Sequence, residues 1–274
     1  MLSGYRSGMS VRVMTTNVLS PEHADWDSRQ PVLQSTLAEL RPDVIALQEV
    51  VTADFLDSGY ALAWHGRRSA DGVGAALASR WPLGTVAETD LQVNNRTEDF
   101  PWAGVVVAEI LAPEPFLFVH NKPSWPIPQT YEREQQALRC ARFIEEQRAG
   151  RRIHVVLAGD FDATPDSSSI RFWTGRQSLG GMSVAYQDAW EALHPDDPGH
   201  TFSPRNPLVR EGEMFLETGR RIDYIMVRCG SHGPTLEVAD CFLAFDQPVD
   251  GVWATDHFGV VADLRMPARP PSSW

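Results

Sequence analysis

The chain has 274 residues, 43% of them hydrophobic and including 9 Trp and 12 Phe, which is ample material for a large core. Its formal net charge is −12 at pH 7, whereas proteins that hold nucleic acid through many phosphate contacts usually carry a basic face. This charge disfavours long, tight, non-specific binding to duplex DNA. The sequence also lacks an apolar run long enough to span a bilayer.

The compartment can be predicted from the first residues and from the cysteines. The opening Met1–Met9 lacks the apolar stretch of a signal peptide, which predicts a cytoplasmic protein. Cys140, Cys229 and Cys241 are odd in number and show no metal-binding spacing. We therefore expect reduced thiols in the core of a cytoplasmic monomer.

The first third of the chain predicts three strands and a helix. Alternating apolar residues indicate a strand at Val11–Val18, and apolar residues at helical spacing indicate a helix over Val32–Leu40 that closes at Arg41-Pro42. Short apolar runs then predict strands at Val44–Leu47 and Gly72–Ser79.

Further along, two strands around Ala112-Pro113 are close enough to form a hairpin, and a helix and three more strands follow. In order these are Val105–Ile110, Phe116–His120, the helix face at Ala137–Ile144, and strands at Ile153–Ala158, Ile222–Val227 and Gly259–Leu264. Strands and helices alternate without a strict βαβ period. The pattern favours an α/β fold with mixed sheets covered by helices.

Three long segments have no predicted element: Thr85–Gly104, Asn121–Tyr131 and His194–Arg220. Long loops on a rigid scaffold are where specificity is usually set, and these carry the aromatic residues Trp102, Trp125 and Phe202. Residues 267–274 hold three prolines and two serines, which predicts a disordered tail after a single domain at residues 1–266.

Six apolar runs end at a carboxylate, a carboxamide or an imidazole, residues that belong on a surface unless a site needs them. They are Asn17, Glu49, His120, Asp160 with Asp162, Asp223, and Asp256 with His257. Because these strand ends are spread from one end of the chain to the other, they predict one composite site. Oxygen ligands of this kind suit Mg²⁺ or a similar cation.

Individual residues allow first assignments. Glu49 ends a buried strand where an unpaired carboxylate would be costly, so a metal ion is its expected partner. Asn17 supplies a carboxamide that could bind the metal or orient a phosphate, although alone it would be a turn asparagine. Asp160 could accept a proton from a water near a metal, or cap a helix in the turn before Pro165.

The six motifs, in this order, resemble the endonuclease/exonuclease/phosphatase superfamily, which includes DNase I, apurinic endonucleases, sphingomyelinases and inositol polyphosphate 5-phosphatases. The resemblance covers roughly Val11 to Leu264, nearly the whole chain. It implies a four-layer α/β sandwich, two mixed β-sheets flanked by helices, with the site at one edge. It also implies Mg²⁺ as cofactor, with Mn²⁺ or Ca²⁺ as substitutes.

The resemblance assigns roles to these residues. It implies that Asp160 activates the attacking water, that Asp223 pairs with His257, and that Asp256 contacts the metal directly or through water. His120 stands where apurinic endonucleases and exonuclease III have tyrosine and the other branches have histidine. We include His120 among the catalytic residues on this ground.

Asp162 departs from the family pattern, in which most members have asparagine at this position. A carboxylate cannot donate a hydrogen bond and would repel a phosphate. We therefore expect a second metal bridging Asp160 and Asp162, or a protonated Asp162; the remaining alternative is a replacement with little consequence. Lys122, two residues after His120, could contact a substrate phosphate as a point charge or be a solvated loop lysine.

Together these patterns predict a Mg²⁺-dependent phosphoesterase that hydrolyses a phosphodiester or a phosphomonoester. One alternative is a nuclease acting on DNA or RNA, which the net charge disfavours. Another is a non-catalytic binding module on the same fold. The motifs bind a phosphate and the loops read the rest of the molecule, so the substrate stays open.

Overall fold

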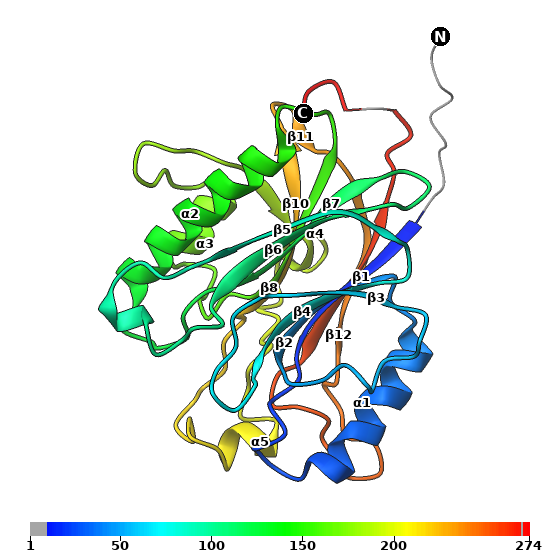
Figure 1. The fold of residues 1–274 in the computed structure, drawn as a ribbon, viewed down its shortest axis with the longest axis vertical. Helices are drawn as coiled ribbons and strands as arrows, with labels where there is room; N and C mark the ends of the chain where they lie inside the picture. Colours follow the sequence, from blue (N-terminus) through cyan, green and yellow to red (C-terminus); the bar gives the residue numbers. More distant parts are fainter. Residues whose placement is uncertain (1–9, 270) are drawn as a thin grey trace.

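The computed structural model describes residues 10–269 and 271–274, in which two β-sheets pack face to face with helices on their outer sides (Figure 1). The first sheet has the order β12-β13-β1-β2-β4-β3. Its strands are β1 Ser10–Asn17, β2 Val44–Val50, β3 Ala61–Trp64, β4 Gly74–Ser79, β12 Glu237–Ala244 and β13 Gly259–Arg265.

The second sheet has the order β11-β10-β8-β7-β6-β5, and β9 pairs with β10. Its strands are β5 Leu83–Asp90, β6 Gly104–Ile110, β7 Phe116–Lys122, β8 His154–Asp160, β9 Tyr186–Asp188, β10 Asp223–Gly230 and β11 Gly233–Pro234. Both sheets are mixed, because β1 and β2 are parallel, β7 and β8 are parallel, and the other pairs are antiparallel. The predicted four-layer α/β sandwich is confirmed.

The helices complete the outer layers. They are α1 Trp26–Leu40, α2 Thr130–Arg148, α3 Ser168–Trp173, α4 Ala189–Leu193 and α5 Pro207–Arg210, with a 3₁₀ turn at Asn95–Thr97. The largest apolar cluster draws on both sheets and fills the space between them. Separate clusters lie under α1 and under α2 with α3, so each sheet has an apolar face on both sides.

All three segments expected to be loops contain some regular structure; Asn121–Tyr131 includes the end of β7, at Lys122, and the start of α2, at Thr130. The prediction of a loop over Thr85–Gly104 is wrong at its start, because β5 continues to Asp90. This strand lies at the edge of its sheet and has no buried residue, so it lacks the apolar pattern that marks a buried strand. The segment His194–Arg220 contains the short helix α5.

The ends of the chain have simple descriptions. The Met1–Met9 opening lies outside the described residues. Among the described residues of the predicted tail there is no helix or strand, and the ring of Trp274 lies 4.9 Å from that of His154. No helix in the described part of the chain is long and apolar enough to cross a membrane.

Strand direction brings the polar strand ends to one edge. Parallel β1 and β2 end together with Asn17 and Glu49, and parallel β7 and β8 end together near His120 and Asp160. Antiparallel β10 begins at this edge, where Asp223 is paired with Asp160. The two sheets thus place carboxylates from distant parts of the sequence side by side.

Candidate active site

Asn17 joins the two sheets at this edge. Its buried side-chain amide donates a hydrogen bond to Glu49 Oε1 (2.8 Å) and another to Asp160 Oδ2 (3.2 Å). Its own Oδ1 accepts from the backbone N–H of Leu19 (3.0 Å). With the nitrogen facing the carboxylates, Asn17 orients Glu49 and Asp160 in this geometry, while its oxygen is engaged in the turn after β1.

Glu49 leaves the regular ladder of its strand. The pairing of β2 with β4 shifts register between Gln48 and Val50, and Glu49 has a left-handed backbone with φ of 55°. A non-glycine residue in this region is strained, and such bulges re-aim side chains next to active sites. Burial raises the pKa of Glu49 against the opposing charge of Lys122, and the nearby carboxylate of Asp256 raises it further.

Asp160 is held on both oxygens. Its Oδ2 accepts from Lys122 Nζ (2.6 Å) as well as from Asn17, and its Oδ1 accepts from the backbone N–H of Asp162 (3.1 Å). Gly159 is required just before it, because a Cβ there would lie 1.9 Å from the carbonyl oxygen of Asn121. Burial alone would raise the pKa of Asp160, but Lys122 and His257 outweigh it, so this pKa lies below its ordinary range.

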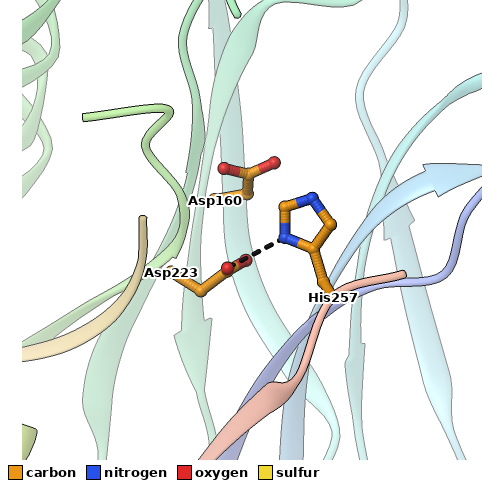
Figure 2. Close-up of side chains that lie close together, drawn as sticks. All are labelled: Asp160, Asp223 and His257. Atoms are coloured by element: carbon orange, nitrogen blue, oxygen red, sulfur yellow. Dashed lines mark hydrogen bonds and ion pairs between the residues drawn. The ribbon is translucent and has the colours of Figure 1, made fainter. Parts of the chain in front are cut away.

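His257 and Asp223 form a buried pair beside Asp160. The Nδ1 atom of His257 lies 2.9 Å from Asp223 Oδ2, and Figure 2 shows Asp160 beside this pair. Burial disfavours the imidazolium, but the charge and hydrogen bond of Asp223 dominate and raise the pKa of His257 to about 10. His257 is therefore a cation at neutral pH.

The segment with Asp256 and His257 is fastened to the end of β1. The Thr255 hydroxyl donates to the backbone carbonyl of Asn17 (2.7 Å) and lies 3.3 Å from Asp256 Oδ1. Asp256 is partly exposed, and its charge reaches Glu49. Glu49 in β2 and Asp256 just before β13 lie on either side of β1, the strand between β2 and β13 in the sheet.

Lys122 is buried, with 1% of its side chain exposed, and its ammonium contacts Asp160 Oδ2 and Asp162 Oδ2. The alternative of a solvated loop lysine is therefore wrong. Asp162 has a left-handed backbone with φ of 49°, which turns its carboxylate back toward Lys122. Burial and the charge of Asp160 raise the pKa of Asp162 against the opposing ammonium.

His120 is fully buried. Its Nε2 lies 2.9 Å from the side-chain nitrogen of Gln48, and among the described residues its Nδ1 has no hydrogen-bond partner. Burial lowers the pKa of His120 to about 3, so the ring is neutral. His120 is not hydrogen-bonded to any of the carboxylates named above.

Three further residues support the site; Arg29 and Thr201 had no sequence signal, and Phe202 was noted only as an aromatic residue of a long loop. Arg29 of α1 is buried and donates to five backbone carbonyls, those of Val18, Leu19, Ser20, His23 and Ala254. Thr201 Oγ1 accepts from the backbone N–H groups of Ile222 (3.0 Å) and Asp223 (3.2 Å). The ring of Phe202 lies 4.8 Å from that of His257.

The site fits a divalent cation by its donor set. Among the described His, Cys, Asp and Glu side chains, Asp160, Asp223 and His257 offer atoms within 4.8 Å of one another. Since His257 Nδ1 is engaged with Asp223 Oδ2, the remaining oxygen ligands are Asp223 Oδ1, which has no hydrogen-bond partner among the described residues, and the carboxylates of Glu49 and Asp256. Glu49 accepts one hydrogen bond, from Asn17, and burial raises its pKa, so its ionised carboxylate would be stabilised by a cation beside it.

The model of the Endonuclease/Exonuclease/phosphatase family matches residues 14–257, which contain all of these side chains. The chain belongs to this family. No curated protein matches its sequence at a significant level.

Solved structures show the same fold at low sequence identity. A humanized TDP2 from D. rerio is 19% identical, with a TM-score of 0.73 over 93% of this chain and 98% of that one. The human Nocturnin catalytic domain with bound sulfate is 18% identical, with a TM-score of 0.71 over 94% and 95%. A family member from Bacteroides vulgatus is 20% identical, with a TM-score of 0.71 over 95% and 100%.

Proposed function

We propose that this protein is a divalent-cation-dependent phosphoesterase that hydrolyses a phosphodiester or phosphomonoester. The observation that carries the proposal is the convergence of Glu49, Asp160, Asp256 and the His257–Asp223 pair at one edge of the two sheets. Asp160, Asp223 and His257 are buried and Glu49 and Asp256 half-buried, and so many ionisable groups in one place are costly unless they act together on a charged ligand.

The proposed cation is Mg²⁺, held by Glu49 and Asp256, with Asn17 orienting the Glu49 carboxylate. A bound divalent cation would neutralise charge on the phosphoryl oxygens. Mn²⁺ or Ca²⁺ would substitute for it, because all three prefer oxygen ligands.

The remaining residues have defined parts. Asp160 stays ionised because its pKa is lowered, so it can orient an attacking water and accept a hydrogen bond from it. His257 presents a positive charge fixed by Asp223, which suits a phosphate oxygen that gains negative charge in the transition state. His120 is neutral and buried, so we assign it to positioning of Gln48 and the end of β7 rather than to proton transfer.

A nuclease is the second candidate function. It draws support from a D. rerio TDP2 structure described as complexed with single strand DNA product, which is 18% identical to this chain. The net charge of −12 works against extended duplex binding. A short single strand that presents one phosphate to the site would meet less of this repulsion than a duplex.

The test is a hydrolysis screen in Mg²⁺ and Mn²⁺ over short single-stranded and duplex DNA, RNA, phospholipids, sugar phosphates and nucleotides. The wild type should release product from at least one class, and the His257→Ala variant should lose a factor on the order of 10²–10⁴ on that class. A correctly folded wild type without activity on any class, and without bound divalent cation, would favour the non-catalytic binding module.

A further inference from the structure

Lys122 is the only lysine among the 24 basic side chains of the chain. Its Nζ lies 2.6 Å from Asp160 Oδ2, contacts Asp162 Oδ2, and lies 5.5 Å from the centre of the Trp102 ring. An ammonium is a compact point charge, whereas a guanidinium is a wide planar fork. In a chain whose other basic side chains are arginines, the single ammonium group therefore lies between the carboxylates of Asp160 and Asp162.

Asp160 and Asp162 would attract a divalent cation if Lys122 were absent. The backbone of Asp162 turns its carboxylate toward that of Asp160, and an oxygen of each contacts the same ammonium. Two convergent carboxylates form the kind of oxygen site that Mg²⁺ and Mn²⁺ prefer. The ammonium lies where such an ion would have to bind.

We propose that Lys122 is a built-in cation that occupies the place of a second divalent ion between Asp160 and Asp162, so that the site takes a single divalent ion. The position of that single ion, at Glu49 and Asp256, rests on the proposed function. The part of Lys122 rests on its own contacts and burial.

This arrangement accounts for the departure of Asp162 from the family pattern. The sequence suggested a second metal or a protonated Asp162, because two neighbouring carboxylates repel each other. The ammonium of Lys122 removes that need. The charges of Asp162 and Lys122 cancel, so the pair gives the site the same net charge as two neutral residues would. Lys122 is then a positioning residue that fixes Asp160 Oδ2.

The experiment counts Mn²⁺ ions per chain by titration calorimetry and equilibrium dialysis in four proteins: wild type, Lys122→Met, Asp162→Asn and the double variant. We expect one ion in the wild type and two in Lys122→Met, because its carboxylate pair is then free. Asp162→Asn should bind one ion, since Lys122 remains on Asp160. The double variant should also bind one, because a single carboxylate is left at that place.

The outcomes separate the two proposals. Two ions in the wild type, or one ion in a folded Lys122→Met protein, would overturn the built-in cation and leave the phosphoesterase proposal standing. No ion in the wild type would remove the metal from the proposed function. If Lys122→Met then gains one ion, Lys122 would still be supported as a cation substitute. If Lys122→Met gains none, both the metal in the proposed function and the built-in cation would be overturned.

If Lys122→Met folds poorly, melting temperatures with and without Mn²⁺ provide a second test of the proposal. Removing the ammonium leaves the neighbouring carboxylates of Asp160 and Asp162 without a cation between them, so this variant should melt below the double variant, and Mn²⁺ should raise its melting temperature more than that of the wild type. A Lys122→Met protein that Mn²⁺ does not rescue, together with a double variant that is no more stable, would contradict the proposal.

Discussion

The Nδ1 atom of His257 lies 2.9 Å from Oδ2 of Asp223, although the two residues are 34 positions apart and precede or begin strands of different sheets. Asp223 is the first residue of β10, and His257 comes just before β13. The pair therefore ties the two sheets together at the edge that holds the site, and it fixes the charge of the histidine.

Asp223→Asn should move the alkaline limb of the pH–rate profile. Asp223 raises the pKa of His257 to about 10, so the imidazolium persists through neutral pH and is lost only above it. Without the carboxylate the pKa of His257 should fall toward its ordinary value, which shifts the limb by roughly three pH units to lower pH.

The raised pKa of His257 also stabilises the fold below pH 6.5, and this contribution fades between pH 6.5 and about 10.

The measurement is activity and urea unfolding from pH 6 to 10. Asp250→Asn, at an exposed position, is the matched control. If the alkaline limb of Asp223→Asn coincides with that of the wild type, His257 is not the group that titrates.

Glu49→Gln should abolish the divalent-cation-dependent activity while leaving the fold intact. The variant keeps the shape of the side chain, so Asn17 can still donate to an oxygen there, but the anionic ligand is lost. Calorimetric Mg²⁺ titration of Glu49→Gln and of the exposed control Glu39→Gln measures the effect. Unchanged Mg²⁺ affinity with persisting turnover would show that the metal assignment is wrong.

The convergence of the site residues could be predicted because each polar residue interrupts an apolar run. Asn17, Glu49, Asp160 and Asp223 all come at or next to the end of a buried strand, and strand direction then brings them to one edge. The family resemblance supplied the sandwich, which the two sheets of the structure confirm, and the family model match confirms the family. The roles of individual residues remain predictions.

Other features depend on tertiary contacts that leave no pattern in the sequence. Arg29 looks like any arginine on an amphipathic helix, and only the folded chain brings it the carbonyls of the turn after β1 and of Ala254. The contact of Lys122 with Asp162 requires the pairing of β7 with β8 and the left-handed backbone of Asp162. Strand β5 lies on a sheet edge and is exposed, so periodicity could not reveal it.

Arg29→Met should lower the stability of the fold, although Arg29 does not itself contact the carboxylates of the site. The guanidinium donates to carbonyls on both the turn after β1 and the segment at Ala254, and methionine would leave these buried acceptors unpaired. We expect a loss of about 3 kcal/mol in the free energy of unfolding. Arg142→Met, on an exposed position of α2, should change it by less than about 0.5 kcal/mol. Equal effects in urea unfolding would contradict this account of Arg29.

His154→Phe should make the protein less sensitive to acid. His154 is buried, neither ring nitrogen has a hydrogen-bond partner among the described residues, and burial lowers its pKa to about 4. A depressed pKa stabilises the fold above pH 6.5, and this contribution is lost as the pH falls toward 4. The wild type should lose on the order of 2–3 kcal/mol more than the variant over this window.

Unfolding free energies of wild type, His154→Phe and the exposed control His23→Phe at pH 7, 5.5 and 4 test this prediction. Only the slope with pH is compared, so a change in packing at neutral pH does not affect the result. Parallel slopes for wild type and His154→Phe would show that His154 does not carry the acid sensitivity.

Gly159→Ala should damage both stability and the position of Asp160. A Cβ at this residue would lie 1.9 Å from the carbonyl oxygen of Asn121, so either β7 or β8 must move, and each carries site residues at its end. Gly181→Ala is the matched control, because Gly181 has a φ of +76° and nothing within 4 Å of the added carbon. The control should cost about 1 kcal/mol for its backbone alone, and Gly159→Ala about 3 kcal/mol or more. Since a misplacement of about 1 Å can cost a factor on the order of 10² in rate, turnover should fall in Gly159→Ala and not in the control.

Urea unfolding and activity measurements on both variants test this prediction. A Gly159→Ala protein as stable and as active as Gly181→Ala would mean that the close approach to Asn121 does not position Asp160.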